Sequence, residues 1–251
     1  MSKSRENIIA LIDRALERNQ SITLITHYLS DYGEMILDAI VRRITETYGR
    51  PDLADIVYTS IKELVMNAAK ANLKRVLLLK YNLNPEDPEH YEECMRLFKQ
   101  NLPENRIRTF RRDFKTHNLP IKITFMYRPH KVLKVAIKNN FTLLPQEEER
   151  IREKFKTSAQ YTDLMQFYLE HGDDTEGAGM GITLVGILLT QSGINKRNFA
   201  VYSSHADHET VARLEIPLAR DYETSRDRFA REVEERGISP DEYRQSLQTD
   251  A

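Results

Sequence analysis

Two pairs of short β-like segments constrain the fold of this chain most strongly. "IKITFMY" and "VLKVAIKN" alternate apolar and polar residues, and the "RPHK" between them is typical of a hairpin turn. "FAVYSS" and "TVARLEIPL" form a second such pair further along the chain. Strands joined by hairpins pair antiparallel, whereas strands that alternate with helices form parallel sheets. The pattern therefore predicts an α+β fold, an α/β sandwich in which a sheet is backed by helices.

The other segments mostly show helical periodicity. Apolar residues recur at helical spacing from Arg5 to Arg18 and again after Asp31, with the β-rich "SITLITHYLS" between them. A longer helix is predicted from near Asp52 to Tyr81. Three regions are expected: a helix–strand–helix extension (residues 1–50), a main domain (51–218) with an inserted helical pair (about 82–119), and a charged tail that is helical or partly disordered (219–251).

Composition and charge narrow the classes of function. The chain has 251 residues, 40% of them apolar, which is enough for one domain with a sizeable core. A formal net charge of −1 gives no global field that would attract nucleic acid or acidic membranes. Cys94 is the single cysteine, which excludes a disulfide framework and a cysteine-based metal site. The first residues lack a signal peptide's apolar core and no apolar run could span a bilayer, so we expect a cytoplasmic protein without membrane contact.

The long predicted helix carries three polar residues on one face. Glu63, Asn67 and Lys70 in "KELVMNAAKAN" are spaced by four and three residues, which brings their side chains together on a helix. An amide oxygen can ligate Mg²⁺, which usually shares its ligands with substrate phosphates. A carboxylate one turn away can orient or deprotonate a hydroxyl or water, and a lysine can neutralise phosphate charge.

A glycine-rich segment precedes an apolar helix. In "TEGAGMGITLVGILLTQSG", Gly177, Gly179 and Gly181 alternate with other residues. A P-loop would need Lys and then Ser or Thr after the last glycine, where Ile182 and Thr183 stand. A dinucleotide fingerprint would need a strand before the first glycine, but "HGDDTE" is typical of a loop. Two interpretations remain: a lid that delivers phosphates to the helix N-terminus, or a loop that allows close helix packing.

Together these motifs resemble the GHKL ATPases, the superfamily of gyrase-type, heat-shock-chaperone, histidine-kinase and mismatch-repair ATPases. "ELVMNAAKA" resembles the N box of that family, and "EGAGMGITLVGILLTQSGI" resembles the second glycine box of histidine kinases and anti-sigma-factor kinases. "FAVYSSHADHETVARLEIPL" is similar to the closing hairpin. The resemblance covers about Asp52 to Leu218, outside the insertion, and implies a histidine-kinase-like ATPase domain with a mixed sheet.

The resemblance also implies a site for ATP and Mg²⁺. Glu63 would be the general base and Asn67 the Mg²⁺ ligand. Lys70 would contact the phosphates. The lid hinge and the phosphate cradle would be formed by Gly177, Gly179 and Gly181. The base would be bound by Asn139 and Thr210.

One motif departs from the family. The adenine-binding strand of GHKL proteins ends in Asp-x-Gly-x-Gly, whereas "LKVAIKNNFTLL" has Asn139 at the Asp position and Phe141 and Leu143 at the glycine positions. The amide oxygen of Asn139 can still accept a hydrogen bond from the adenine amino group. Phe141 and Leu143 are expected to fill or reshape the purine pocket.

These features lead to one expected function and its alternatives. We expect a cytoplasmic ATP-binding signalling protein of the histidine-kinase or anti-sigma-factor-kinase type. Because no phosphoacceptor helix is evident, it would act on a protein partner in trans, and a homodimer remains open. The alternative is a catalytically inactive GHKL pseudokinase that serves as a protein-interaction module, which the altered adenine motif favours. A gyrase- or chaperone-type switch is less favoured, because residues 219–251 are too short for a transducer domain.

Overall fold

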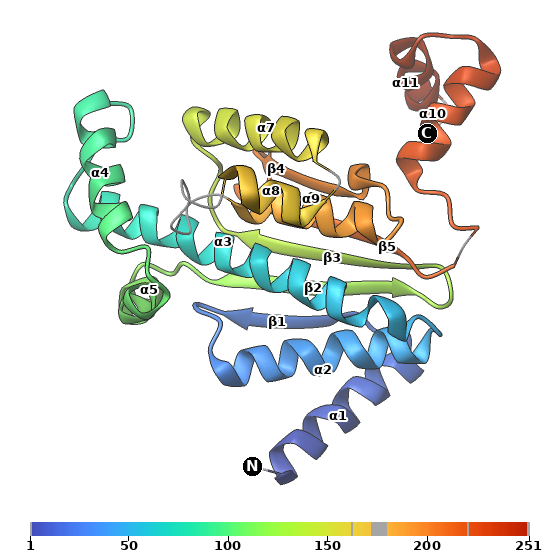
Figure 1. Cartoon of the computed structure of the whole chain (residues 1–251), viewed down its shortest axis with the longest axis horizontal. Coiled ribbons are helices and arrows are strands. Elements are labelled where there is room, and N and C mark those ends of the chain that lie inside the picture. The colour runs from blue at the N-terminus through green and yellow to red at the C-terminus, as the bar shows by residue number, and fades with distance from the viewer. Residues whose placement is uncertain (1, 162, 172–179, 220, 250–251) are drawn as a thin grey trace.

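The computed structural model describes residues 2–161, 163–171, 180–219 and 221–249. The described strands form one sheet in the order β1-β2-β3-β5-β4 (Figure 1). These strands are β1 (Ile22–Thr26), β2 (Ile121–Arg128), β3 (Val132–Asn139), β4 (Phe199–Ser204) and β5 (Glu209–Pro217). Both predicted hairpins are present, as β2–β3 and β4–β5. Every pairing among the described residues is antiparallel, so the sheet is not the mixed one that the resemblance implied.

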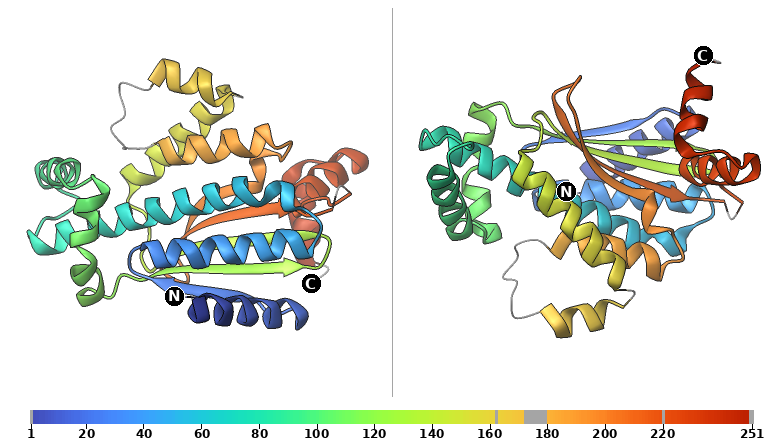
Figure 2. Two further views of the ribbon diagram at one scale, coloured as in Figure 1. Left: turned by 60° about the horizontal axis from the view of Figure 1, so that its bottom comes forward. Right: turned by 90° about the horizontal axis from the view of Figure 1, so that it is seen from above.

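The helices that build the core lie on one face of this sheet. Figure 2 shows the sheet edge-on, with the helices stacked against it. The layer consists of α2 (Asp31–Thr47), α3 (Ala54–Lys80), α7 (Pro145–Gln160) and α9 (Met180–Gln191). Outside it, α1 (Ser2–Glu17) packs against α2. Helix α8 (Leu164–His171) packs on the outer side of α9, away from the sheet (Figure 2). This arrangement confirms the predicted α+β sandwich.

Strand β2 has one buried and one more polar face because its residues alternate. In β2, Ile121, Ile123 and Phe125 are fully buried, whereas Lys122 and Met126 are exposed. Burying a side chain of this size stabilises the fold by about 1.5–3 kcal/mol. The buried side chains of β2 and β3 pack against α3, which therefore forms the centre of the core.

The insertion is helical but is divided differently from the expected pair. It contains α4 (Pro88–Gln100) and two short helices, α5 (Glu104–Thr109) and α6 (Arg111–Thr116), which stand in place of the second helix of the expected pair. The break at Phe110 directs both Ile107 and Phe114 into the core, where each is fully buried.

Helix α8 and the C-terminal tail (219–251) were not fully described by the sequence-based expectations. Helix α8 was not predicted from the sequence. The tail forms two helices, α10 (Ser225–Arg236) and α11 (Pro240–Thr249), next to the sheet end where β5 finishes (Figure 1). Within the described ranges, no helix combines the length and apolar character needed to cross a membrane.

Candidate functional site

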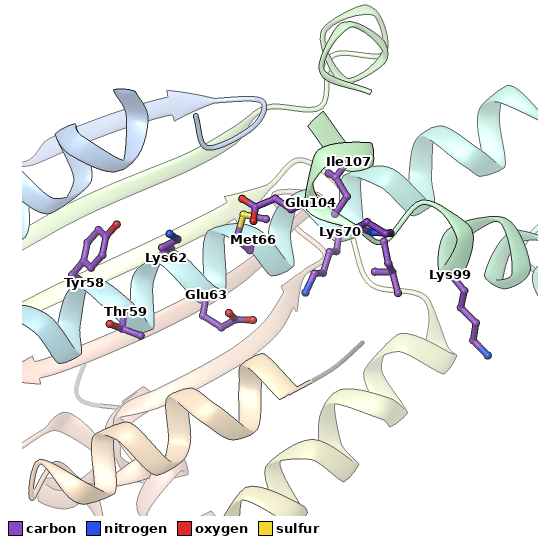
Figure 3. A pocket seen from close by; sticks show the side chains of 11 residues that line it. Tyr58, Thr59, Lys62, Glu63, Met66, Lys70, Lys99, Glu104 and Ile107 are labelled. Carbon is purple, nitrogen blue, oxygen red and sulfur yellow. The ribbon is translucent and has the colours of Figure 1, made fainter. Parts of the chain in front are cut away.

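Helix α3 carries the predicted polar triad beside a large cavity. Glu63 and Lys70 line a cavity of about 820 Å³ between α3 and the insertion, in the size range of ligand pockets. Figure 3 shows Glu63 and Lys70 projecting from the same side of α3. Asn67 lies between them in sequence and lines two smaller cavities on the side of α9.

The first turn of α9 lies directly against this triad. A Cβ atom built on Gly181 would lie 2.8 Å from Cγ of Glu63, and closer still to Oε1 of Glu63 and Nδ2 of Asn67. No residue other than glycine fits there unless both polar side chains move. Gly181 therefore allows close packing of α9 on α3, which is one of the two interpretations of the glycine-rich segment. The side chains against which it packs, Glu63 and Asn67, are also the candidate functional groups. Gly177 and Gly179 lie outside the described residues.

The predicted base-binding residues lie together in a narrow cavity. Asn139 and Thr210 are directly opposite each other on β3 and β5. With Asn67 and Ile182, they line a cavity of about 90 Å³ between α3, the sheet and α9. The hydroxyl of Thr210 donates to the carbonyl of Phe141 at 2.7 Å. The structure therefore brings Asn67, Asn139 and Thr210 to one place.

A buried amide network orients Asn139. Its Nδ2 donates to Oδ1 of Asn72 at 2.7 Å and to the carbonyl of Ala68 at 3.1 Å. Asn72 in turn donates its Nδ2 to the carbonyl of Leu119 at 2.8 Å, which turns its oxygen toward Asn139. Oδ1 of Asn139 accepts no hydrogen bond from the described residues, so it is the polar atom that this side chain can offer to a ligand. Sequence reasoning missed Asn72, although it lies five residues after Asn67 on the same predicted helix.

Phe141 and Leu143, at the family's glycine positions, narrow this region. Phe141 is buried, and the guanidinium of Arg75 lies 4.5 Å from its ring centre. Leu143 lines the narrow cavity, and its backbone N–H donates to Oγ of Ser203 at 3.0 Å. The cavity is smaller than the roughly 300 Å³ at which ligand pockets begin. A purine fits only if an apolar wall residue such as Leu143 moves.

A third cavity, of about 220 Å³, is strongly basic. Lys70 and Lys74 of α3 and Arg150 and Lys154 of α7 line it, together with Glu147. Burial lowers the pKa of Lys154, and the charge of Arg150 lowers it further. Arg150 and Lys154 were not singled out from the sequence, although their i, i+4 spacing places them on one helix face.

Glu147 ties α7 to α3. Its carboxylate lies 3.2 Å from Nζ of Lys74 and 2.6 Å from Nη2 of Arg75, and it accepts the backbone N–H of Leu144 at 3.1 Å. Burial by itself would raise the pKa of Glu147, but Lys74 and Arg75 outweigh it and hold that pKa below its usual value. Glu147 is therefore a structural ion-pair centre.

The comparisons with known proteins give little beyond the geometry. No protein-family model matches the chain, and no solved structure is significantly similar to it. The chain is 25% identical over 225 residues to an uncharacterized protein of Treponema pallidum (strain Nichols). The alignment covers 90% of this chain but 43% of that protein, so the chain spans less than half of the relative's length.

Proposed function

We propose that this chain binds Mg²⁺–ATP between α3, the β3–β5 ladder and α9. It would act in the cytoplasm as a signalling protein of the histidine-kinase type, on a protein partner in trans. The observation that carries the proposal is the contact of Gly181 with Glu63 and Asn67, because it joins two motifs that lie far apart in sequence.

The chemistry of the residues at this contact suits a magnesium nucleotide. The first backbone N–H groups of a helix such as α9 have no partner within the helix and favour anions. Nδ2 of Asn67 faces Gly181, which leaves Oδ1 for an ion. No group of three His, Cys, Asp or Glu among the described residues could hold a metal, so the ion would be shared with phosphate oxygens, as is usual for Mg²⁺. The bound nucleotide would supply the phosphoryl group, and Glu63 would accept a proton from the attacking group.

A non-catalytic interaction module is the second candidate. The observation in its favour is the narrow cavity beside Asn139, which the apolar residues Leu143 and Ile182 help to line. A protein that no longer binds a nucleotide could keep this cavity narrow, because no purine would have to enter it.

Calorimetry with ATP, ADP and GTP, with and without Mg²⁺, separates the two. We expect the parent protein to bind ATP in a Mg²⁺-dependent way, and Asn67→Ala to lose that dependence. Asn140→Ala is the control, because Asn140 is exposed and lines none of these cavities. If the parent binds no nucleotide at millimolar concentration, the interaction-module proposal stands instead.

A further inference from the structure

The basic cavity between α3 and α7 contains two cations, Arg150 and Lys154, for which the described residues provide no ion-pair partner. Glu147 is the single carboxylate among its described lining residues, and it already pairs with Lys74 and Arg75. Arg150 lies 5.8 Å from the ring centre of Tyr91 and contacts the sulfur of Met95. No acidic side chain within the described ranges forms an ion pair with Arg150 or Lys154.

This arrangement is unfavourable without a ligand. Like charges at i, i+4 on a helix repel each other, and Arg150 and Lys154 have that spacing. Lys154 is also half-buried, and burial disfavours its charged form. An anion in the cavity would remove both penalties, because it would supply the missing partner to two cations at once.

The position of the cavity indicates which anion fits. It shares Asn67, Leu143, Ile151 and Ile182 with the narrow cavity that Asn139 and Thr210 line, so the two adjoin along α3. Its opposite wall is formed by Met95 and Phe98 of α4, in the insertion. A molecule with a base at the sheet and a chain of phosphates would extend from the narrow cavity into the basic one.

We propose that the basic cavity receives an oligophosphate chain, with Arg150 and Lys154 of α7 as phosphate-binding residues. The proposal rests on the proposed nucleotide site and names further residues of it. Because the contacts are with phosphates, inorganic tripolyphosphate should bind in the cavity and compete with ATP.

Calorimetric titration with inorganic tripolyphosphate tests this with matched variants of one helix. The test variant is Arg150→Gln with Lys154→Met. The control is Arg152→Gln with Lys156→Met, which removes the same charges from exposed positions two residues further on. We expect tripolyphosphate and ATP to bind the test variant at least about tenfold more weakly than the parent, since hydrogen bonds to charged groups are lost. The control should bind both ligands nearly as the parent does.

The melting temperature supplies a readout that separates binding from folding. Without ligand, the test variant should melt at or above the temperature of the parent, because it loses unpaired cations. Tripolyphosphate should raise the melting temperature of the parent and the control, but not of the test variant.

The outcomes distinguish this inference from the proposed function. If the parent binds ATP and the test variant binds both ligands as tightly as the control, the role of Arg150 and Lys154 is wrong while the nucleotide site stands. If tripolyphosphate binds and ATP does not, the oligophosphate cavity stands and the ATP proposal fails. A parent that binds no tripolyphosphate at millimolar concentration overturns the inference.

Discussion

Asn139 of β3 and Asn72 of α3 are joined by a hydrogen bond of 2.7 Å in the buried layer between sheet and helix. Because Asn72 also donates to the carbonyl of Leu119, the direction of each amide is determined by its neighbour. Asn139 therefore presents its nitrogen to α3. Asn139, which was expected from the resemblance to contact adenine, has a structural role in this network.

The first prediction concerns this network. Asn139→Asp would place a carboxylate against the carbonyl of Ala68 and Oδ1 of Asn72, two acceptors that need a donor. Leaving acceptors unsatisfied next to a buried charge should cost about 3 kcal/mol or more. The melting temperature should fall by roughly 6–12 °C for a chain of this size. Asn140→Asp, at an exposed position, is the control, and equal melting of both variants would contradict the network.

The second prediction concerns acid stability and Glu147. The pKa of Glu147 is lowered in the folded state. Its contribution to the free energy of unfolding is therefore fully present above the unfolded-state pKa of about 4.3, and it is lost as pH falls through the folded-state pKa. Glu147→Gln would leave Lys74 and Arg75 without their partner, so it should destabilise the protein by about 3 kcal/mol at pH 7.

Urea unfolding from pH 7 to pH 3 measures the effect. The difference between parent and Glu147→Gln should shrink below about pH 4, where the parent carboxylate also becomes protonated. Glu148→Gln is the control, because Glu148 pairs with the exposed Arg152 at 3.6 Å and should contribute less than about 1 kcal/mol. A pH-independent difference would show that the charge of Glu147 is not what stabilises the α3–α7 contact.

The third prediction concerns the approach of α9 to α3. Gly181→Ala should displace Glu63 and Asn67, because the new methyl group would overlap with both. We expect about tenfold weaker ATP binding, corresponding to roughly one charged hydrogen bond, with the fold retained. Gly186→Ala is the control on the same helix: its methyl group would overlap with Oγ of Ser158, away from the triad, and should lower stability without changing ATP affinity. If both variants bind ATP equally well, the approach at Gly181 has no role in binding.

The fourth prediction concerns catalysis. Glu63→Gln keeps the size of the side chain but cannot accept a proton at neutral pH. Hydrolysis or transfer of the phosphoryl group should slow by a factor of about 10²–10⁴, while ATP affinity changes little. Radiolabelled ATP followed in single-turnover reactions measures the rate. Equal rates for variant and parent would remove Glu63 from the mechanism.

The sequence determined the features that depend on short-range periodicity. Alternation in residues 121–127 identified β2, because neighbouring side chains of a strand point to opposite faces, and the turn-like "RPHK" placed β3 beside it. The i, i+4, i+7 spacing of Glu63, Asn67 and Lys70 was enough to place them on one side of a helix, whatever that helix packs against.

Only the tertiary structure decided which distant segments meet. Gly181 reaches Glu63 and Asn67 because α9 packs on α3, and Arg150 and Lys154 reach the cavity beside Lys70 because Glu147 holds α7 to α3. The break of the insertion at Phe110 likewise follows from the burial of Ile107 and Phe114. Such contacts arise from the sum of many buried apolar interactions across the whole chain, and no local pattern encodes that sum.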